Sequence, residues 1–346
     1  MFPREPAWVF QAAERIITTP VAQNGQIIVR TSEGVYWLNA QGTPLQRVEV
    51  SGFTCLNCFN GPPVLCKEML LVPEGGHSLS VFVVSTGALA WTAIPSANPD
   101  GSYVPSNVPV ESIACGEQAV YVTRYNWNLT AYDYEGVVLW ESDSLDRSRS
   151  SLATDGHIVY LGADIYIKAY DGLSGTILWS EKMGAFVRSI QLVSNTLYIG
   201  LFEAPFLAMD VDSRTIRWHV DFPAGEYPFL IEGETLYITN QDRLAAISRK
   251  DGRILWERRL PEANLGSPVV AKGVLYVRST RGYLHALEAS TGYEVGGLRI
   301  QSDGPFSYAS DRGPGVAENL LLVPFGDHRL LAYRLIDLET SAGKER

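Results

Sequence analysis

The sequence predicts an all-β protein, an eight-bladed β-propeller built from four-stranded antiparallel blades, on three observations. First, six of the eight tryptophans occupy one slot of a recurring unit, which returns about every 40 residues. Second, the slot ends similar segments, such as LTAYDYEGVVLW (129–140), KAYDGLSGTILW (168–179) and LAAISRKDGRILW (244–256). Third, each segment follows a short apolar strand rich in Val, Ile, Leu and Tyr. Several short strands repeated at this period are typical of a propeller.

Each unit divides into four expected strands, as the seventh unit illustrates. It contains PVVA (268–271), VLYVRS (274–279) and YLHALEA (283–289), and a turn at 290–292 leads into the fourth strand. Glycine in such turns reaches a positive φ without a steric cost, which suits tight hairpins. The same pattern predicts the blades 20–48, 63–91, 110–140, 151–179, 190–218, 228–256, 268–296 and 315–335.

The eighth unit ends after its third strand, and the missing strand is expected at the other end of the chain. The segment WVFQAAERIITTPVAQNG (8–25) aligns without gaps with WERRLPEANLGSPVVAKG (256–273). The N-terminal strand, residues 7–12, should therefore complete the last blade. Closure of this kind removes exposed sheet edges. We expect residues 1–346 to form a single propeller domain.

Composition excludes several kinds of partner. The formal net charge of −10 argues against binding to nucleic acid or to an anionic lipid surface. No apolar run approaches the roughly 18 residues that span a membrane. The N-terminus lacks a basic start followed by an apolar core, so a cytoplasmic protein is expected if Met1 is the native start. The alternative, if a signal peptide has been removed, is a periplasmic or extracellular protein.

The repeats resemble those of the PQQ-like, quinoprotein-type eight-bladed propellers. The resemblance rests on units such as LTAYDYEGVVLW, KAYDGLSGTILW and YLHALEASTG, and it extends from Trp8 to Leu335. It implies a family that includes quinone-dependent alcohol dehydrogenases and outer-membrane assembly scaffolds similar to the lipoprotein BamB. The repeat motif is structural in all of them, so it selects neither activity.

The resemblance also implies a structural role for the tryptophan that ends the last strand. It should pack between adjacent blades and donate its indole N–H to backbone, whereas a floor for a planar cofactor is the alternative. This role is expected for Trp8, Trp91, Trp140, Trp179, Trp218 and Trp256. In the first and seventh units Gln46 and Gly296 take this place. Trp37 and Trp127 lie outside the pattern, and each is either packed or an exposed contact residue.

Quinone chemistry has little support in the sequence. Dehydrogenases of this family use a pair of adjacent cysteines and a bound Ca²⁺, and this chain has no adjacent cysteines and no recognisable calcium loop. We therefore expect no PQQ, no other cofactor and no catalytic residues. Turn acids such as Asp171, Asp210 and Asp251 are interpreted as turn formers.

The cysteines form the one unusual cluster. Cys55 and Cys58 have a C-x2-C spacing, which is compatible with one half of a zinc or iron–sulfur site or with a redox pair. Cys66 and Cys115 fall near first strands, where a small buried side chain fits. The main interpretation is that the four cysteines are buried or free thiols.

Three connections between blades are longer than the others. A connection from a tryptophan slot to the next second strand usually takes about 20 residues, but three take about 25 to 30. The additional residues lie in 51–63, 92–109 and 300–314, which we expect to emerge on one face of neighbouring blades. Aromatic residues among Gly, Pro and Ser suit protein contacts, although surface loops also tolerate insertions. The candidate contact residues are Phe53, Phe59, Tyr103, Trp127, Phe306 and Tyr308.

The most favoured function is a non-catalytic protein-binding or scaffold module. The net charge of −10 suggests a partner protein with basic patches. The alternative is an enzyme or ligand sensor, including one that binds a quinone, with its site at the central funnel.

Overall fold

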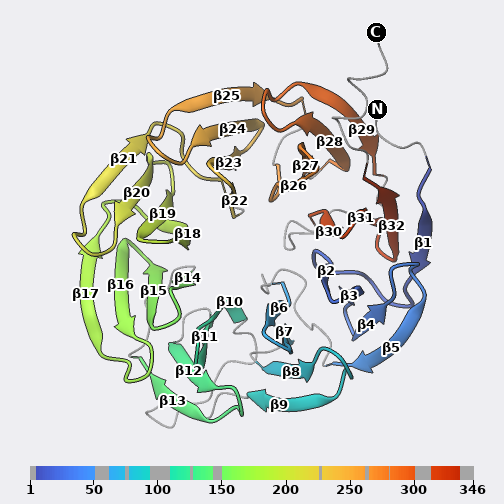
Figure 1. The fold of residues 1–346 in the computed structure, drawn as a ribbon, viewed down its shortest axis with the longest axis horizontal. Helices are drawn as coiled ribbons and strands as arrows, with labels where there is room; N and C mark the ends of the chain where they lie inside the picture. Colours follow the sequence, from blue (N-terminus) through green and yellow to red (C-terminus); the bar gives the residue numbers. More distant parts are fainter. Residues whose placement is uncertain are drawn as a thin grey trace. The chain divides into compact units, whose positions relative to one another are not determined.

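The protein folds as eight four-stranded antiparallel sheets, the blades of an eight-bladed β-propeller, and this confirms the predicted fold class. The computed structural model describes residues 5–50, 62–74, 78–93, 110–124, 128–142, 150–225, 228–261, 265–279, 281–300 and 313–335. The chain divides into two compact units, Met1–Val50 with Glu226–Arg346 (the first unit) and Ser51–Gly225 (the second unit). Figure 1 shows the strands of each blade in chain order.

The first unit holds blades one, six, seven and eight. Blade one contains β2 (Val21–Gln23), β3 (Gln26–Arg30), β4 (Gly34–Leu38) and β5 (Pro44–Glu49). Blade six contains β22 (Leu230–Glu232), β23 (Thr235–Asn240), β24 (Arg243–Ser248) and β25 (Ile254–Arg259). Blade seven contains β26 (Val269–Ala271), β27 (Val274–Arg278), β28 (Tyr283–Glu288) and β29 (Glu294–Arg299). Blade eight contains β30 (Gly315–Ala317), β31 (Leu320–Phe325), β32 (Arg329–Arg334) and β1 (Trp8–Gln11).

The second unit holds blades two to five. Blade two contains β6 (Val64–Cys66), β7 (Met69–Pro73), β8 (Leu79–Val83) and β9 (Leu89–Ala93). Blade three contains β10 (Val110–Cys115), β11 (Ala119–Arg124), β12 (Leu129–Asp133) and β13 (Val138–Glu141). Blade four contains β14 (Ser150–Thr154), β15 (Ile158–Ala163), β16 (Tyr166–Asp171) and β17 (Ile177–Lys182). Blade five contains β18 (Val187–Val193), β19 (Thr196–Leu201), β20 (Phe206–Asp210) and β21 (Ile216–Val220).

The N-terminal strand closes the last blade, as the alignment predicted. β1 pairs antiparallel with β32, and Trp8 stands opposite Ala332. Figure 1 shows β1, at the blue end of the chain, beside β32 at the red end. Phe10 is buried in a core cluster with Leu322, Leu330 and Ala332, so the strand contributes apolar packing as well as backbone hydrogen bonds.

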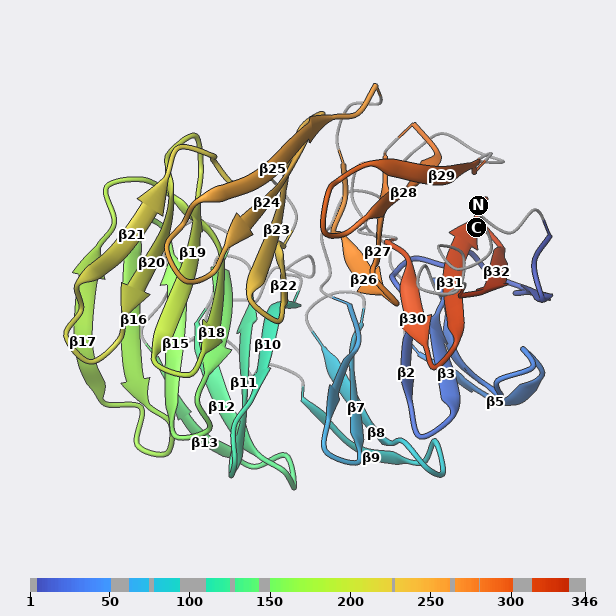
Figure 2. The same ribbon diagram turned by 45° about the horizontal axis from the view of Figure 1, so that its top comes forward.

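Burial within each blade follows strand order. Second strands such as β11 and β19 are buried along their whole length, whereas the fourth strand β17 exposes alternate residues. Figure 2 shows blades three, four and five packed side by side in the second unit. Two sides of each blade can then be distinguished. The turn side carries the turns between first and second and between third and fourth strands. The connection side carries the second-to-third hairpins and the connections to the next blade.

The tryptophan slot lies against a turn glycine of the next blade on the turn side. The indole N–H of Trp140 donates to the carbonyl of Gly172 (2.9 Å), and a Cβ at Gly175 would lie 2.6 Å from the Trp140 ring. Gly175 has φ +70°, so glycine satisfies the turn geometry and the close approach together. The same indole bond joins Trp8 to Ala40, Trp91 to Tyr134 and Trp256 to Ala289.

The two blades without this tryptophan differ from each other. In blade one, Gln46 occupies the slot, and the large ring belongs instead to Trp37 on the neighbouring strand. Trp37 pairs in register with Gln46 and is fully buried. Trp37 is therefore a packed residue, not an exposed contact. In blade seven, Gly296 takes the slot. The following blade offers no turn to receive an indole there, because its third and fourth strands are the last and first strands of the chain.

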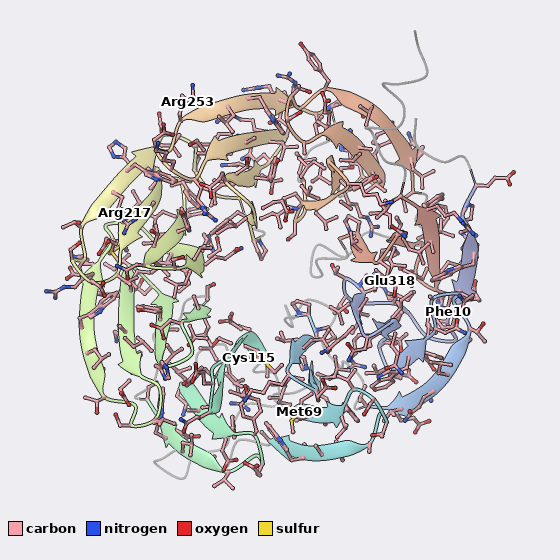
Figure 3. All side chains as sticks on the ribbon, viewed as in Figure 1. Phe10, Met69, Cys115, Arg217, Arg253 and Glu318 are labelled. Atoms are coloured by element: carbon pink, nitrogen blue, oxygen red, sulfur yellow. A yellow bond between two sulfur atoms is a disulfide. The ribbon has the colours of Figure 1, made fainter. Side chains whose placement is uncertain are left out.

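The prediction that Cys66 and Cys115 are buried or free thiols was wrong. They form a disulfide between β6 and β10, the first strands of blades two and three, with their Cα atoms 5.8 Å apart (Figure 3). The two residues are 49 positions apart in the sequence, so their juxtaposition depends on how neighbouring blades pack. Cys55 and Cys58 lie outside the described residues.

Candidate protein-binding surface

Three exposed aromatic residues lie on segments of the connection side of blades four and five. Tyr166 begins β16, Phe186 precedes β18, and Phe202 follows β19. Their exposed fractions are 37%, 51% and 39%, in the order of the sequence. Large apolar groups at this exposure on a folded surface mark interaction sites when they gather. Phe186 and Phe202 lie on hydrogen-bonded segments, whereas Tyr166 is on the face of β16 opposite Ile167, which packs toward blade five. We call Phe186 and Phe202 the aromatic cluster.

Backbone hydrogen bonds hold the aromatic cluster in place. The amide of Phe202 donates to the carbonyl of Phe186 (2.9 Å), which joins the hairpin of blade five to the connection before it. The backbone amide of Val187 donates to the backbone carbonyl of Asp164 (2.7 Å), and that of Met183 donates to the backbone carbonyl of Ile165 (2.7 Å). The segments that carry Phe186 and Phe202 are therefore bonded to each other and to the hairpin of blade four. A surface ordered before binding loses less entropy when a partner docks.

The core beneath the cluster allows the blades to approach closely. Gly162 in β15 carries no side chain where a Cβ would lie 2.6 Å from a methyl group of Val187 in β18. Val187 and Ile190 belong to a buried apolar cluster, against which Met183, Ala185 and Ala204 pack. The aromatic cluster thus stands on tightly packed strands.

Charged groups surround the aromatic cluster. The Arg188 guanidinium lies 4.3 Å from the centre of the Phe202 ring, a cation–π arrangement that orients the ring. Asp164 and the exposed Glu203 flank the aromatic rings in sequence. Asp221 is also exposed, in the connection that follows β21. The cluster therefore has charged neighbours of both signs, with Arg188 in contact with Phe202 and Glu203 next to it in the chain.

The connection side of the first unit has a different character. Arg259, Arg281 and Arg299 are exposed there, and they end β25, follow β27 and end β29. Arg259 lies 3.8 Å from Asp242, and other arginines on this side also lie close to acids. Arg15 lies 3.1 Å from Asp327, and Arg243 lies 2.7 Å from Glu257. Hydrogen bonds from Arg243 hold the pKa of Glu257 below its usual value against the opposing effect of burial.

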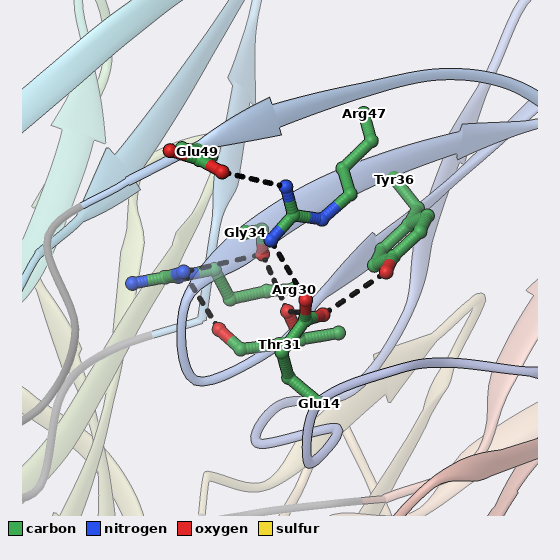
Figure 4. A network of polar contacts seen from close by, with 7 residues as sticks. All are labelled: Glu14, Arg30, Thr31, Gly34, Tyr36, Arg47 and Glu49. Atoms are coloured by element: carbon green, nitrogen blue, oxygen red, sulfur yellow. Dashed lines mark hydrogen bonds and ion pairs between the residues drawn. The ribbon is translucent and has the colours of Figure 1, made fainter.

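A polar network fastens the connection between blades eight and one (Figure 4). Glu14 accepts hydrogen bonds from Thr31 (3.1 Å), Tyr36 (3.0 Å) and Arg47 (2.7 Å). Burial alone would raise the pKa of Glu14, but these three donors hold it below its usual value. The three donors hold the Glu14 carboxylate inside the network, which gives it a structural role. The buried Arg30 adds to it by donating to the Thr31 carbonyl (2.6 Å).

The contact residues predicted from sequence all lie outside the described residues. They are Phe53, Phe59, Tyr103, Trp127, Phe306 and Tyr308, in or near the three long connections. Connection length does not reveal the aromatic cluster, because Phe186 and Phe202 lie in short connections and only long ones stand out in the sequence. A comparison of aromatic residues immediately outside each expected strand would have found both.

The tryptophans of the repeat slot contact aromatic neighbours as well as backbone. The rings of Trp179 and Trp218 lie 5.9 and 6.0 Å from those of Tyr160 and Tyr198.

Turn acids form hydrogen bonds within their own turns. Asp171 accepts from the amides of Leu173 and Ser174 and from the Ser174 hydroxyl. These bonds lower the pKa of Asp171.

A search of the described residues found no group of three or more His, Cys, Asp or Glu side chains that could hold a metal ion. In the same part of the chain, no helix is long and apolar enough to cross a membrane.

The chain is similar in sequence to outer membrane protein assembly factors and similar in fold to other solved propellers. It is 24% identical over 213 residues to the outer membrane protein assembly factor BamB of Shewanella oneidensis, an alignment that covers 55% of this chain and 53% of the relative. The chain thus spans about half the length of the curated relatives it matches. The structure of BamB from Moraxella catarrhalis superimposes with a TM-score of 0.73 at 14% identity, covering 95% of this chain and 99% of the other.

A quinohemoprotein alcohol dehydrogenase from Pseudomonas putida HK5 gives the same TM-score, 0.73, at 12% identity, covering 95% of this chain and 76% of the enzyme. At such identities the structural likeness establishes the fold alone. Family assignment rests on sequence. The family model described as outer membrane protein assembly factor BamB matches residues 75–201 and 206–341, most of the chain. The protein therefore belongs to this PQQ-like propeller family.

Proposed function

We propose that this protein is a non-catalytic docking module in outer membrane protein assembly, and that it binds a partner protein through the aromatic cluster. The observation that carries the proposal is the exposure of Phe186 and Phe202 on adjacent segments fixed by backbone hydrogen bonds. The family match supports the biological process. Membership alone could not separate a scaffold from a dehydrogenase, because one fold hosts both.

The chemistry of the cluster favours a particular kind of partner surface. Aromatic residues and arginine are enriched among the few residues that dominate binding free energy, and Arg188 lies beside Phe202. The partner should present apolar side chains to the rings and basic side chains near Glu203 and Asp221. Such a partner would also suit the net charge of −10.

We propose further that the three long connections contribute to the same function. Tyr103, Phe306 and Tyr308 are the residues we expect to matter most there. Replacing all three by Ala should leave the fold intact and weaken the complex by several kcal/mol, roughly the effect of truncating hot-spot residues.

The disulfide supports a location outside the cytoplasm. Disulfides persist in oxidising compartments such as the periplasm and are rare where cytosolic thiols are kept reduced. Together with the family assignment, the Cys66–Cys115 bond favours the periplasmic alternative over the cytoplasmic expectation. Cell fractionation with alkylation of free thiols before lysis tests this. Recovery of the protein in the cytoplasm with Cys66 and Cys115 alkylated would contradict it.

A matched pair of exposed positions tests the docking proposal. Leu173 lies on the turn side of blade four and is 52% exposed, close to the exposure of Phe186. A photo-crosslinking amino acid at position 186 should capture a distinct partner protein in cells, and the same group at position 173 should not. In a strain that depends on the protein, Phe186→Ala with Phe202→Ala should reduce the amount of folded outer membrane proteins. Leu173→Ala should leave that amount unchanged.

The two readouts must agree. Equal crosslinking at positions 173 and 186, or normal outer membrane protein levels in the double variant, would show that the cluster is not the docking site. Thermal unfolding of each variant should be measured beside them, so that a loss of function cannot be mistaken for a loss of fold.

A further inference from the structure

The second strand of most blades carries a tyrosine in register with the tryptophan slot. Tyr237 pairs with Ala246, which pairs with Trp256. In blade three, Tyr121 pairs with Ala131 and through it with Trp140. The equivalent row of blade eight is Leu322, Ala332 and Trp8. Blade eight thus keeps the alanine and the tryptophan but has leucine where blades three and six have a phenol. Blade two also has leucine there, in the row Leu71, Val81 and Trp91, but without the alanine.

The phenol has a defined partner in the following blade. The Tyr237 hydroxyl donates to the carbonyl of Ala289 (3.2 Å), which also accepts from the indole of Trp256 (2.9 Å). A carbonyl oxygen has two lone pairs, and this one uses both. In blade three, the Tyr121 hydroxyl reaches the same place and contacts Gly172, whose carbonyl accepts from Trp140. Burial raises the pKa of Tyr121 to about 12, so the phenol stays neutral there.

The junction between blades eight and one lacks the second of these donors. The Ala40 carbonyl accepts from the indole of Trp8 (2.9 Å), as the Ala289 carbonyl does from Trp256. Within the described part of the chain no hydroxyl donates to Ala40, because Leu322 stands where Tyr237 stands in blade six. The methyl group of Ala40 is no obstacle to a phenol, since Ala289 carries the same methyl beside Tyr237.

A cavity occupies this position. It has a volume of about 290 Å³ and is lined by residues of both blades, including Ile27, Ala40, Val316, Ala317 and Leu320. Leu322 does not line the cavity, but it belongs to the same buried core cluster as the lining residues Ile27 and Ala317. The corresponding cavity between blades three and four, where Tyr121 is present, measures about 80 Å³. The missing ring therefore coincides with the larger space.

We propose that this cavity is a binding site for a neutral phenol ring, in the place that tyrosine fills between other blades. The lining residues Ile27, Val316 and Leu320 suit the ring, and the free lone pair of the Ala40 carbonyl suits the hydroxyl. Gln23, Asn24 and Gln26 make the rest of the wall polar. Glu318 lines the cavity too (Figure 3 labels it), and its carboxylate disfavours an anionic ligand. This inference does not depend on the docking function proposed above.

Titration with p-cresol, monitored by amide NMR of the intact protein, tests the site. We expect one equivalent to bind, with the largest shifts at Ala40 and Ala317. Toluene, which lacks the hydroxyl, should bind about tenfold more weakly because the hydrogen bond is lost. Leu322→Tyr should fill the space and abolish binding while raising the thermal midpoint.

A reciprocal variant provides the matched control. Tyr237→Leu should create a second cavity of the same kind between blades six and seven, so the stoichiometry should rise from one to two. N-acetyl-tyrosinamide distinguishes the sources of the phenol. Binding of both probes indicates a tyrosine side chain of a polypeptide, and binding of p-cresol alone indicates a small free phenol. Absence of p-cresol binding at millimolar concentration, undiminished binding to folded Leu322→Tyr, or equal affinity for toluene would overturn the proposal.

Discussion

The turn side and the connection side of the blades obey different rules. On the turn side the same contact recurs, with an indole donating to backbone over a glycine or short turn of the next blade, as in Trp91, Trp140 and Trp256. On the connection side of the described blades a backbone bond recurs, from the residue after the fourth strand to the hairpin between second and third strands, but the exposed side chains differ. Blades four and five expose aromatic rings, and the first unit exposes arginines. We infer that the turn side carries stability and that the connection side is free to carry recognition.

The largest effect on stability is expected when the closing strand is removed. Deletion of residues 1–12 takes away β1, its hydrogen bonds with β32, and the Trp8 contact on Gly42. We expect a marked drop in the thermal midpoint, and loss of the folded state at 37 °C is the extreme outcome. Unchanged thermal unfolding of the truncated protein would contradict closure by this strand.

Trp140→Ala probes one turn-side contact within a single unit. The change removes the ring between Tyr121 and Tyr170 and leaves the Gly172 carbonyl without its donor. The free energy of unfolding should fall by about 3–5 kcal/mol, as for other large-to-small core substitutions. Chemical denaturation measures it. Partner crosslinking at position 186 should persist at temperatures where the variant is folded. Its loss at those temperatures would contradict the inference that stability and recognition reside on different sides of the blades.

The disulfide is expected to have a somewhat smaller effect. It joins β6 and β10 across 49 residues, and β6 is only three residues long. Cys66→Ser with Cys115→Ser should lower the free energy of unfolding by about 2–4 kcal/mol. Wild-type protein in a reducing agent serves as the control and should show the same change. A stability that is insensitive to both treatments would show that apolar packing alone holds this junction.

Alkaline pH should destabilise the fold through the buried tyrosines of the second strands. Burial raises the pKa values of Tyr121, Tyr160 and Tyr276 to about 12, against 10 for an ordinary tyrosine. Above pH 10 the unfolded chain loses these protons while the folded chain keeps them, so stability must fall as the pH rises from 10 to 12. Phenolate absorbance during a pH titration should show these tyrosines ionising together with unfolding. Their ionisation near pH 10 in folded protein would contradict the prediction.

The smallest effect on stability is expected from the aromatic cluster. Phe186→Ala and Phe202→Ala alter exposed rings, so each should change the free energy of unfolding by no more than about 0.5 kcal/mol. A loss of several kcal/mol would place these rings in the core and remove the argument for a binding surface.

The sequence by itself determined the repeat, the four strands of each blade and the closing role of the N-terminal strand. These features depend on local hairpins and on a period of about 40 residues, and both are visible along the chain. It also determined which glycines would stand in turns, because tight turns need residues that accept a positive φ.

Only the tertiary structure decided which distant side chains meet. Cys66 and Cys115 join because first strands of neighbouring blades lie side by side, which no spacing in the sequence reveals. Phe186 and Phe202 gather because two short segments share backbone bonds on one side of blade five. The cavity between blades eight and one lies at the junction where Leu322 takes the place that tyrosine has in blades three and six. Packing between blades depends on residues far apart in the sequence, and the blades of the repeat differ most at these junctions.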